Sequence, residues 1–182
     1  MLPRFLAILL LSLTTPLIYA DQTDVRLGDL FATLQDTEDA RQIQITESQI
    51  WEIWLQHAND DVQQLMLVGT QRMNAGRYAQ AMIVFNRLTE SFPEYAEGWN
   101  KRATLHYVLG NLDASVGDIE KTLALEPRHF GALSGLGMVY IQREELSKAR
   151  QAFEDLLEIH PNSPNAQQNL ELVKEQLRFS VI

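Results

Sequence analysis

The 182-residue chain contains no cysteine, which excludes several kinds of chemistry at once. Without thiols there can be no disulfide bond, no thiol nucleophile, no cysteine-ligated iron–sulfur cluster and no thiolate zinc site. Basic residues are also scarce: 15 lysines and arginines face 24 aspartates and glutamates, giving a net charge of -9. A nucleic-acid-binding surface needs a basic face that neutralises phosphates, so we expect no nucleic-acid partner.

Patterns typical of catalytic and metal sites are missing as well. No two histidines have the four-residue spacing that places two ligands on one helical face, and no nucleophile-elbow motif occurs. Adjacent acidic pairs suit solvated helix ends better than two carboxylates facing each other across a sugar. The sequence therefore predicts no catalytic residue, no metal and no cofactor, and gives the histidines structural roles: His57, His106, His129 and His160.

One apolar run stands at the N-terminus. Within residues 1–20, Arg4 precedes the run from Phe5 to Leu13, Thr-Thr-Pro follows, and the small residue Ala20 comes before polar sequence. This order predicts a secretory signal peptide cleaved after Ala20, and hence an exported, periplasmic protein. The alternative is an uncleaved membrane anchor, but the segment is shorter than the roughly 18–20 apolar residues that a span requires. No later segment is long and apolar enough to cross a membrane, so we expect no span in the mature chain.

A period of 34 residues organises the rest of the chain. Pro93, Pro127 and Pro161 are separated by 34 and 34 residues. Residues of similar size recur in phase with them, in the sets Leu65/Trp99/Leu133, Gly69/Ala103/Gly137, Tyr78/Leu112/Leu146, Ala81/Ser115/Ala149 and Phe85/Ile119/Phe153. Such a period predicts helix pairs that bury a continuous core by stacking on one another. Within this pattern we expect Trp99 to be a buried core residue.

These residues resemble the tetratricopeptide repeat family. The resemblance covers three repeats, at 62–95, 96–129 and 130–163, with departures at Arg72, Arg102 and His106. It implies an all-α fold: a right-handed α-solenoid of three 34-residue helix-turn-helix repeats.

Both flanks of the repeats are expected to be helical caps. Residues 21–61 carry apolar stripes at helical spacing and predict two helices that pack on the first repeat. Residues 164–182 predict a C-terminal capping helix, because Pro164 suits a first helical turn. Trp51 and Trp54 in the N-terminal region are open to two interpretations, as core residues or as an aromatic surface for a partner.

The resemblance also implies a concave groove lined by the first helix of each repeat. The side chains expected to face it are Met66, Thr70, Met73, Asn74, Glu97, Asn100, Thr104, Tyr107, Val108, Gly131, Ser134, Met138, Ile141 and Gln142. None is lysine or arginine, which argues against the clamp for peptide carboxylates that some family members have. Gly131 and Gly135 either permit close helix packing or clear space for a ligand backbone.

We therefore expect a non-catalytic interaction module or scaffold of the bacterial cell envelope, which binds a peptide or protein segment in its groove. One alternative is a structural subunit that forms a homo-oligomer. Another is an enzyme or small-ligand binder built on a helical scaffold, which the missing catalytic patterns disfavour. The sequence does not identify the partner.

Overall fold

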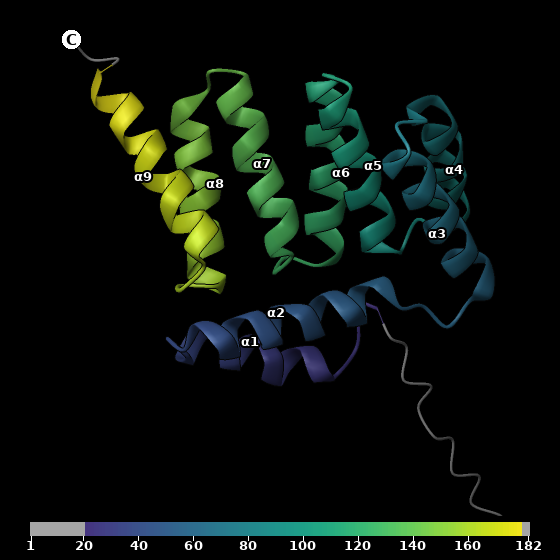
Figure 1. Ribbon diagram of the computed structural model, residues 1–182, viewed down its shortest axis with the longest axis horizontal. Coiled ribbons are helices and arrows are strands. Elements are labelled where there is room, and N and C mark those ends of the chain that lie inside the picture. Colours follow the sequence, from purple (N-terminus) through teal and green to yellow (C-terminus); the bar gives the residue numbers. More distant parts are fainter. Residues whose placement is uncertain (1–20, 180–182) are drawn as a thin grey trace, which may run out of the picture.

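The computed structural model describes residues 21–179, and this part of the chain consists of α-helices without any strand (Figure 1). In chain order the helices are α1 (Arg26–Asp36), α2 (Ala40–Leu55), α3 (Asp60–Asn74), α4 (Tyr78–Ser91), α5 (Ala96–Val108), α6 (Leu112–Leu125), α7 (Phe130–Gln142), α8 (Leu146–Ile159) and α9 (Pro164–Phe179). The expected all-α solenoid is confirmed. The expected signal peptide, residues 1–20, lies outside the described residues.

Three helix pairs, α3–α4, α5–α6 and α7–α8, form the repeats. Each pair turns through one residue with a left-handed backbone: Gly76 at φ 70°, Gly110 at φ 75° and Glu144 at φ 59°. A backbone hydrogen bond then closes the turn. In the middle repeat, the Asn111 N–H, two residues after the C-cap of α5, donates to the His106 carbonyl at 2.9 Å. Glycine adopts this conformation without strain, so the first two turns follow from sequence.

Glycine also sets the distance between the two helices of a pair. A Cβ atom at Gly69 would overlap the ring of Phe85, and one at Gly137 would overlap the ring of Phe153. In the middle repeat the corresponding residues are Ala103 and the smaller Ile119, which lie in one buried cluster. The small and large positions of the repeat therefore compensate each other in volume.

Trp99 is half-buried, so the prediction that it is a core residue was wrong. Its indole Nε1 donates to the Pro93 carbonyl at 2.8 Å, and the Arg102 guanidinium lies 4.8 Å from its ring centroid. Arg102 in turn donates two hydrogen bonds of 2.7 Å to Asp118. Arg102, a charged residue at a position that is usually apolar, thus holds the Trp99 indole at the surface. There the indole ring lies against the guanidinium of the Arg102–Asp118 pair.

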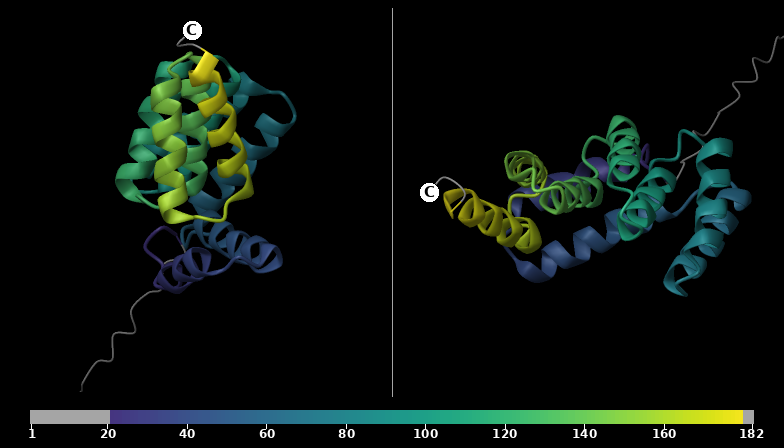
Figure 2. Two further views of the ribbon diagram at one scale, coloured as in Figure 1. Left: turned by 90° about the vertical axis from the view of Figure 1, so that its left-hand side faces the viewer. Right: turned by 90° about the horizontal axis from the view of Figure 1, so that it is seen from above.

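The N-terminal helices do not cap the first repeat, which corrects the sequence prediction. α1 and α2, here called the N-terminal strap, run crosswise beneath the ends of the solenoid helices (Figures 1 and 2). The strap packs against the third repeat and α9 through one apolar cluster, which comprises Leu27, Phe31, Leu34, Ile43, Ile50, Ile53, Trp54, Phe130, Leu133, Leu156 and Ala166. The exposed side of α3 carries Gln63, Gln64 and Gln71 beside a single large apolar residue, Leu67, whereas the strap cluster buries many apolar side chains against the third repeat and α9.

Hydrogen bonds link the strap to the solenoid near both ends of α2. The Tyr95 hydroxyl, at the junction of the first two repeats, donates to the Trp54 carbonyl at 2.8 Å. The Asn162 amide, at the start of the last turn before α9, donates to the Thr37 carbonyl at 2.8 Å. The strap therefore spans the solenoid from the junction of the first two repeats to the turn before α9.

α9 covers the far end of the solenoid, where Leu170 and Val173 pack on Ala149 and Phe153 of α8. None of the helices between residues 21 and 179 combines the length and the hydropathy needed to span a membrane.

Candidate binding site on the concave face

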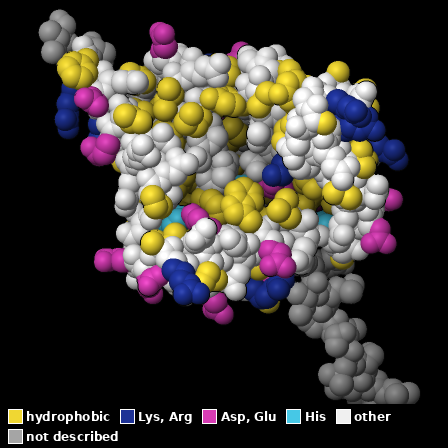
Figure 3. All heavy atoms as spheres, in the orientation of Figure 1, with side chains coloured by type: hydrophobic (Ala, Val, Ile, Leu, Met, Phe, Trp, Pro, Cys, Tyr) yellow, Lys and Arg dark blue, Asp and Glu magenta, His cyan; other side chains and the backbone are white. Residues whose placement is uncertain are grey.

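A pocket of about 140 Å³ lies between α5, α6 and α7, where the second and third repeats meet. We call it the central pocket, and it is lined by Asn100, Ala103, Thr104, Tyr107, Ser115, Ile119, Gly131, Ser134, Gly135 and Met138. Figure 3 shows this side of the molecule hollowed above the strap, with hydrophobic side chains in the hollow.

The central pocket has an apolar interior and a polar edge. Ala103 and Ile119 are buried, while the ring of Tyr107 packs half-buried beside them. Asn100, Thr104 and Ser134 add amide and hydroxyl groups, and none of the lining residues carries a charge. Such a pocket accepts an apolar group of a ligand and offers hydrogen bonds to the polar groups of the ligand next to it.

Six of the predicted groove residues come together in the central pocket: Asn100, Thr104, Tyr107, Gly131, Ser134 and Met138. The others are dispersed. Met66 and Thr70 line a separate hollow beside Leu55, and Met73 packs on the core of the first repeat.

Near the helix ends, Asn74, Val108 and Gln142 are exposed, and Ile141 packs on the α8–α9 cluster.

Two lining residues, Ser115 and Ile119, come from α6, which the sequence analysis did not consider. The second helix of the middle repeat thus contributes to the pocket together with α5 and α7. Ser115 is fixed there because its hydroxyl donates to the Ala103 carbonyl at 2.9 Å. Both positions recur in the 34-residue pattern, but that pattern marks them as packing residues.

Glu97 does not face the groove as predicted, because its side chain is only 1% exposed. Its carboxylate lies 2.9 Å from the Lys101 ammonium and accepts hydrogen bonds from Asn100 at 2.8 Å and His129 at 3.0 Å. Burial opposes the charge, but the hydrogen bond from His129 and the charge of Lys101 outweigh it and hold the pKa of Glu97 below its ordinary value.

The tautomer of His129 follows from its two contacts. Its Nδ1 accepts the backbone N–H of Ala132 at 3.1 Å, so the proton resides on Nε2 and is donated to Glu97. Asn100, which lines the central pocket, connects the pocket to this buried pair through its hydrogen bond to Glu97. Lys101, which the repeat pattern does not single out, pairs with Glu97 and lies with its Nζ 5.7 Å from the Trp51 ring centroid.

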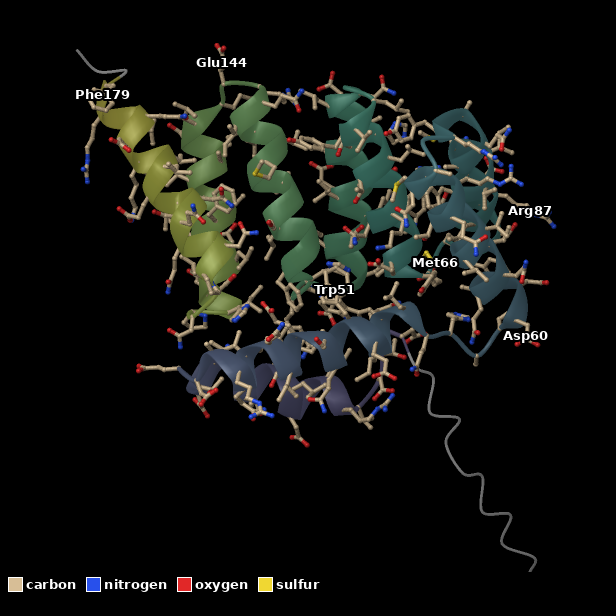
Figure 4. All side chains as sticks on the ribbon, viewed as in Figure 1. Trp51, Asp60, Met66, Arg87, Glu144 and Phe179 are labelled. Atoms are coloured by element: carbon tan, nitrogen blue, oxygen red, sulfur yellow. The ribbon has the colours of Figure 1, made fainter. Side chains whose placement is uncertain are left out.

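The two strap tryptophans have different roles. Trp54 is buried and stacks on His129, with ring centroids 4.1 Å apart, and is therefore a core residue. Trp51 is half-buried and points from α2 toward the solenoid (Figure 4). A Cβ atom at Gly131 would lie 2.6 Å from the Trp51 ring, so this glycine serves close packing.

The repeats match a known family model over residues 69–121 and 100–164, which together make up more than half of the chain. The chain belongs to the tetratricopeptide repeat family. A TPR repeat-containing protein of Rhizobium etli is 32% identical over 152 residues, which cover 84% of this chain and 74% of that protein. DnaJ homolog subfamily C member 3 of Mus musculus is 25% identical over 104 residues, and the match spans 21% of its length.

Solved structures share the fold. The first TPR domain of Spaghetti, bound to an HSP90 peptide, has a TM-score of 0.63 at 21% identity and covers 65% of this chain and 94% of its own. The Yersinia enterocolitica type III secretion chaperone SycD, in complex with a peptide of the translocator YopD, has a TM-score of 0.61 at 17% identity. That match covers 65% of this chain and 96% of SycD.

Proposed function

We propose that the protein is a non-catalytic interaction module that binds a peptide segment of another protein in the central pocket. The observation that carries this proposal is the pocket itself: an uncharged cavity about the size of one side chain, edged by amide and hydroxyl groups. Solved members of the same fold were captured with peptides of HSP90 and of YopD, which supports the same class of ligand here.

The polar edge suits the backbone of an extended segment. The Asn100 amide nitrogen donates to Glu97, so the amide oxygen turns away from that carboxylate and is offered to an incoming N–H. The Thr104 hydroxyl donates to the Asn100 carbonyl, which leaves its oxygen as an acceptor. Backbone groups of a peptide need such partners when they leave water.

Replacing Tyr107 by alanine should abolish most peptide binding, because Tyr107 is the one aromatic residue that lines the central pocket and its side chain is the largest there. Tyr107 also packs beside a buried cluster, so we expect some loss of stability as well. Binding can be measured by titrating the full chain with a peptide selected on it from a displayed random library.

The affinity of the wild type for this peptide should change little between low and moderate salt, because no charged side chain lines the central pocket.

Tyr140→Ala is the matched control. Tyr140 is also half-buried and packs beside an apolar cluster, but it does not line the central pocket. The two variants should lose similar stability, and only Tyr107→Ala should lose the peptide. Equal binding by both variants, or a complex that dissociates at moderate salt, would contradict the proposal.

We further propose that the module works in the bacterial cell envelope after export. The support is the order of charge, apolar run and small residue in residues 1–20. Gln22 already bonds the Glu94 carbonyl and the Ala96 N–H, so cleavage after Ala20 would leave the described contacts intact. N-terminal sequencing of the protein from intact cells should begin at Asp21. Recovery of a cytoplasmic protein that begins at Met1 would refute export.

A further inference from the structure

We infer that Gly135 determines ligand specificity: the side chain it lacks leaves the central pocket open to one aliphatic ligand side chain of leucine or methionine size. This inference rests on the proposed function, since it names the chemistry that the peptide must present at that pocket. It concerns a single position on α7 and not the groove as a whole.

The glycines of α7 differ in what holds them in place. Gly131 is required by the Trp51 ring and Gly137 by the Phe153 ring, because a Cβ atom at either position would overlap an aromatic side chain. A Cβ atom at Gly135 would meet only Ile119 Cδ1, at an ordinary contact distance of 3.7 Å. Its backbone is helical, so no left-handed conformation demands glycine either.

Glycine at this position therefore carries a cost without a packing reason. Inside a helix it is the least favourable residue after proline, because it loses the most backbone entropy on folding. The corresponding residues of the other two repeats, 34 and 68 positions earlier, are Lys101 and Leu67, which have long side chains. The third repeat alone leaves this place empty.

The empty place lies inside the central pocket. Gly135 lines the pocket, and the one atom that a Cβ would touch belongs to Ile119, which lines it as well. Any side chain at position 135 would therefore occupy volume that a ligand could use. The cost of glycine in the helix is explained if that volume is needed for binding.

The size and lining of the pocket select its occupant. Its volume of about 140 Å³ is close to the roughly 150 Å³ of an engineered apolar cavity that binds benzene, so it suits one medium-sized side chain. Ala103, Ile119 and Met138 provide apolar walls, and the thioether of Met138 adapts to varied shapes. A charged side chain would lose its hydration there without a partner of opposite charge.

The test uses the full chain and acetylated, amidated peptides Ser-Gly-Xaa-Gly-Ser, in which Xaa is leucine, methionine, alanine, aspartate or lysine. Binding is followed by NMR titration of the Ile119 and Met138 methyl signals. The leucine and methionine peptides should bind at least about tenfold more tightly than the alanine peptide. The aspartate and lysine peptides should bind more weakly than the alanine peptide. Gly135→Leu, which fills the pocket, should bring the leucine and alanine peptides to within about twofold of each other.

Gly117→Ala is the matched control, because Gly117 lies within α6, is exposed, and has nothing within 4 Å of an added Cβ. Gly135→Ala and Gly117→Ala should both raise the melting temperature by a few degrees, and only the change at position 135 should weaken the leucine peptide.

Three results would overturn the inference. If Gly135→Leu keeps the preference for leucine while the wild type binds the series, position 135 is not the determinant, and peptide binding still stands. A lower melting temperature for Gly135→Ala would mean that packing requires the glycine. If no peptide of the series shifts the signals of the wild type, the central pocket is not a peptide site and the proposed function fails with it.

Discussion

Replacing Trp54 by alanine should lower the free energy of unfolding by about 3–5 kcal/mol, the range for a large aromatic side chain removed from a core. Trp54 is 1% exposed and packs against the rings of His129, Phe130 and Phe31, at the centre of the contact between strap and solenoid. Its loss leaves a cavity at a contact that many residues share. Urea unfolding followed by circular dichroism measures the change.

Trp99→Ala provides the comparison, because Trp99 is half-buried and held at the surface by Arg102. We expect it to cost about 1–3 kcal/mol, within the ordinary range for single substitutions. A Trp54 variant that is no less stable than the Trp99 variant would show that the strap contributes little to the fold.

Replacing Glu97 by alanine should cost about 3–5 kcal/mol, because it removes one partner of a buried ion pair. Lys101 would lose its counter-charge, and the His129 Nε2–H and the Asn100 amide would lose their acceptor. Chemical denaturation at pH 7 measures this loss. Glu171→Ala is the control, since Glu171 is 69% exposed and pairs with Lys174 at the surface. We expect no measurable change there.

The stability that Glu97 contributes should depend on pH in a defined direction. Its pKa is lower in the folded protein than in the unfolded chain, so the folded state binds fewer protons at that site. The contribution is fully present above the unfolded value of about 4.3 and is lost as the pH falls through the folded value. The difference between the wild type and Glu97→Gln should therefore narrow below about pH 4. A constant difference down to pH 3 would contradict this assignment.

The solenoid could be predicted from sequence because its packing is set by offsets within 34 residues. Gly137 facing Phe153, and Ala103 facing Ile119, are local pairings that the periodic pattern records directly. Helical register likewise places Asn100, Thr104 and Tyr107 on one face of α5, so their joint position on the central pocket followed from spacing.

The contacts that could not be predicted join residues far apart in the sequence. Two partners of Glu97, Asn100 and Lys101, are near it in the sequence, but the third, His129, lies 32 positions away. The local pattern therefore gave no sign that the carboxylate is buried, and Glu97 was interpreted as a groove residue. The strap has no second copy in the sequence that could indicate its docking position. Its apolar stripe shows that it packs, and only the structure shows that it packs beneath α7, α8 and α9. The repeat pattern predicted Trp99 in the core, but its contact with the Arg102 guanidinium holds it at the surface.

The strap also changes how the solenoid is expected to fold and open. In a simple repeat array each unit contacts only its neighbours, so terminal units can unfold while the rest stays folded. Here the contacts between Thr37 and Asn162 and between Trp54 and Tyr95 span 125 and 41 positions. Such long closures slow folding relative to a purely local array, because chain entropy is lost before they form. Once formed, these contacts couple the junction of the first two repeats to the turn before α9. The curvature of the concave face is therefore fixed and does not vary with bending between repeats.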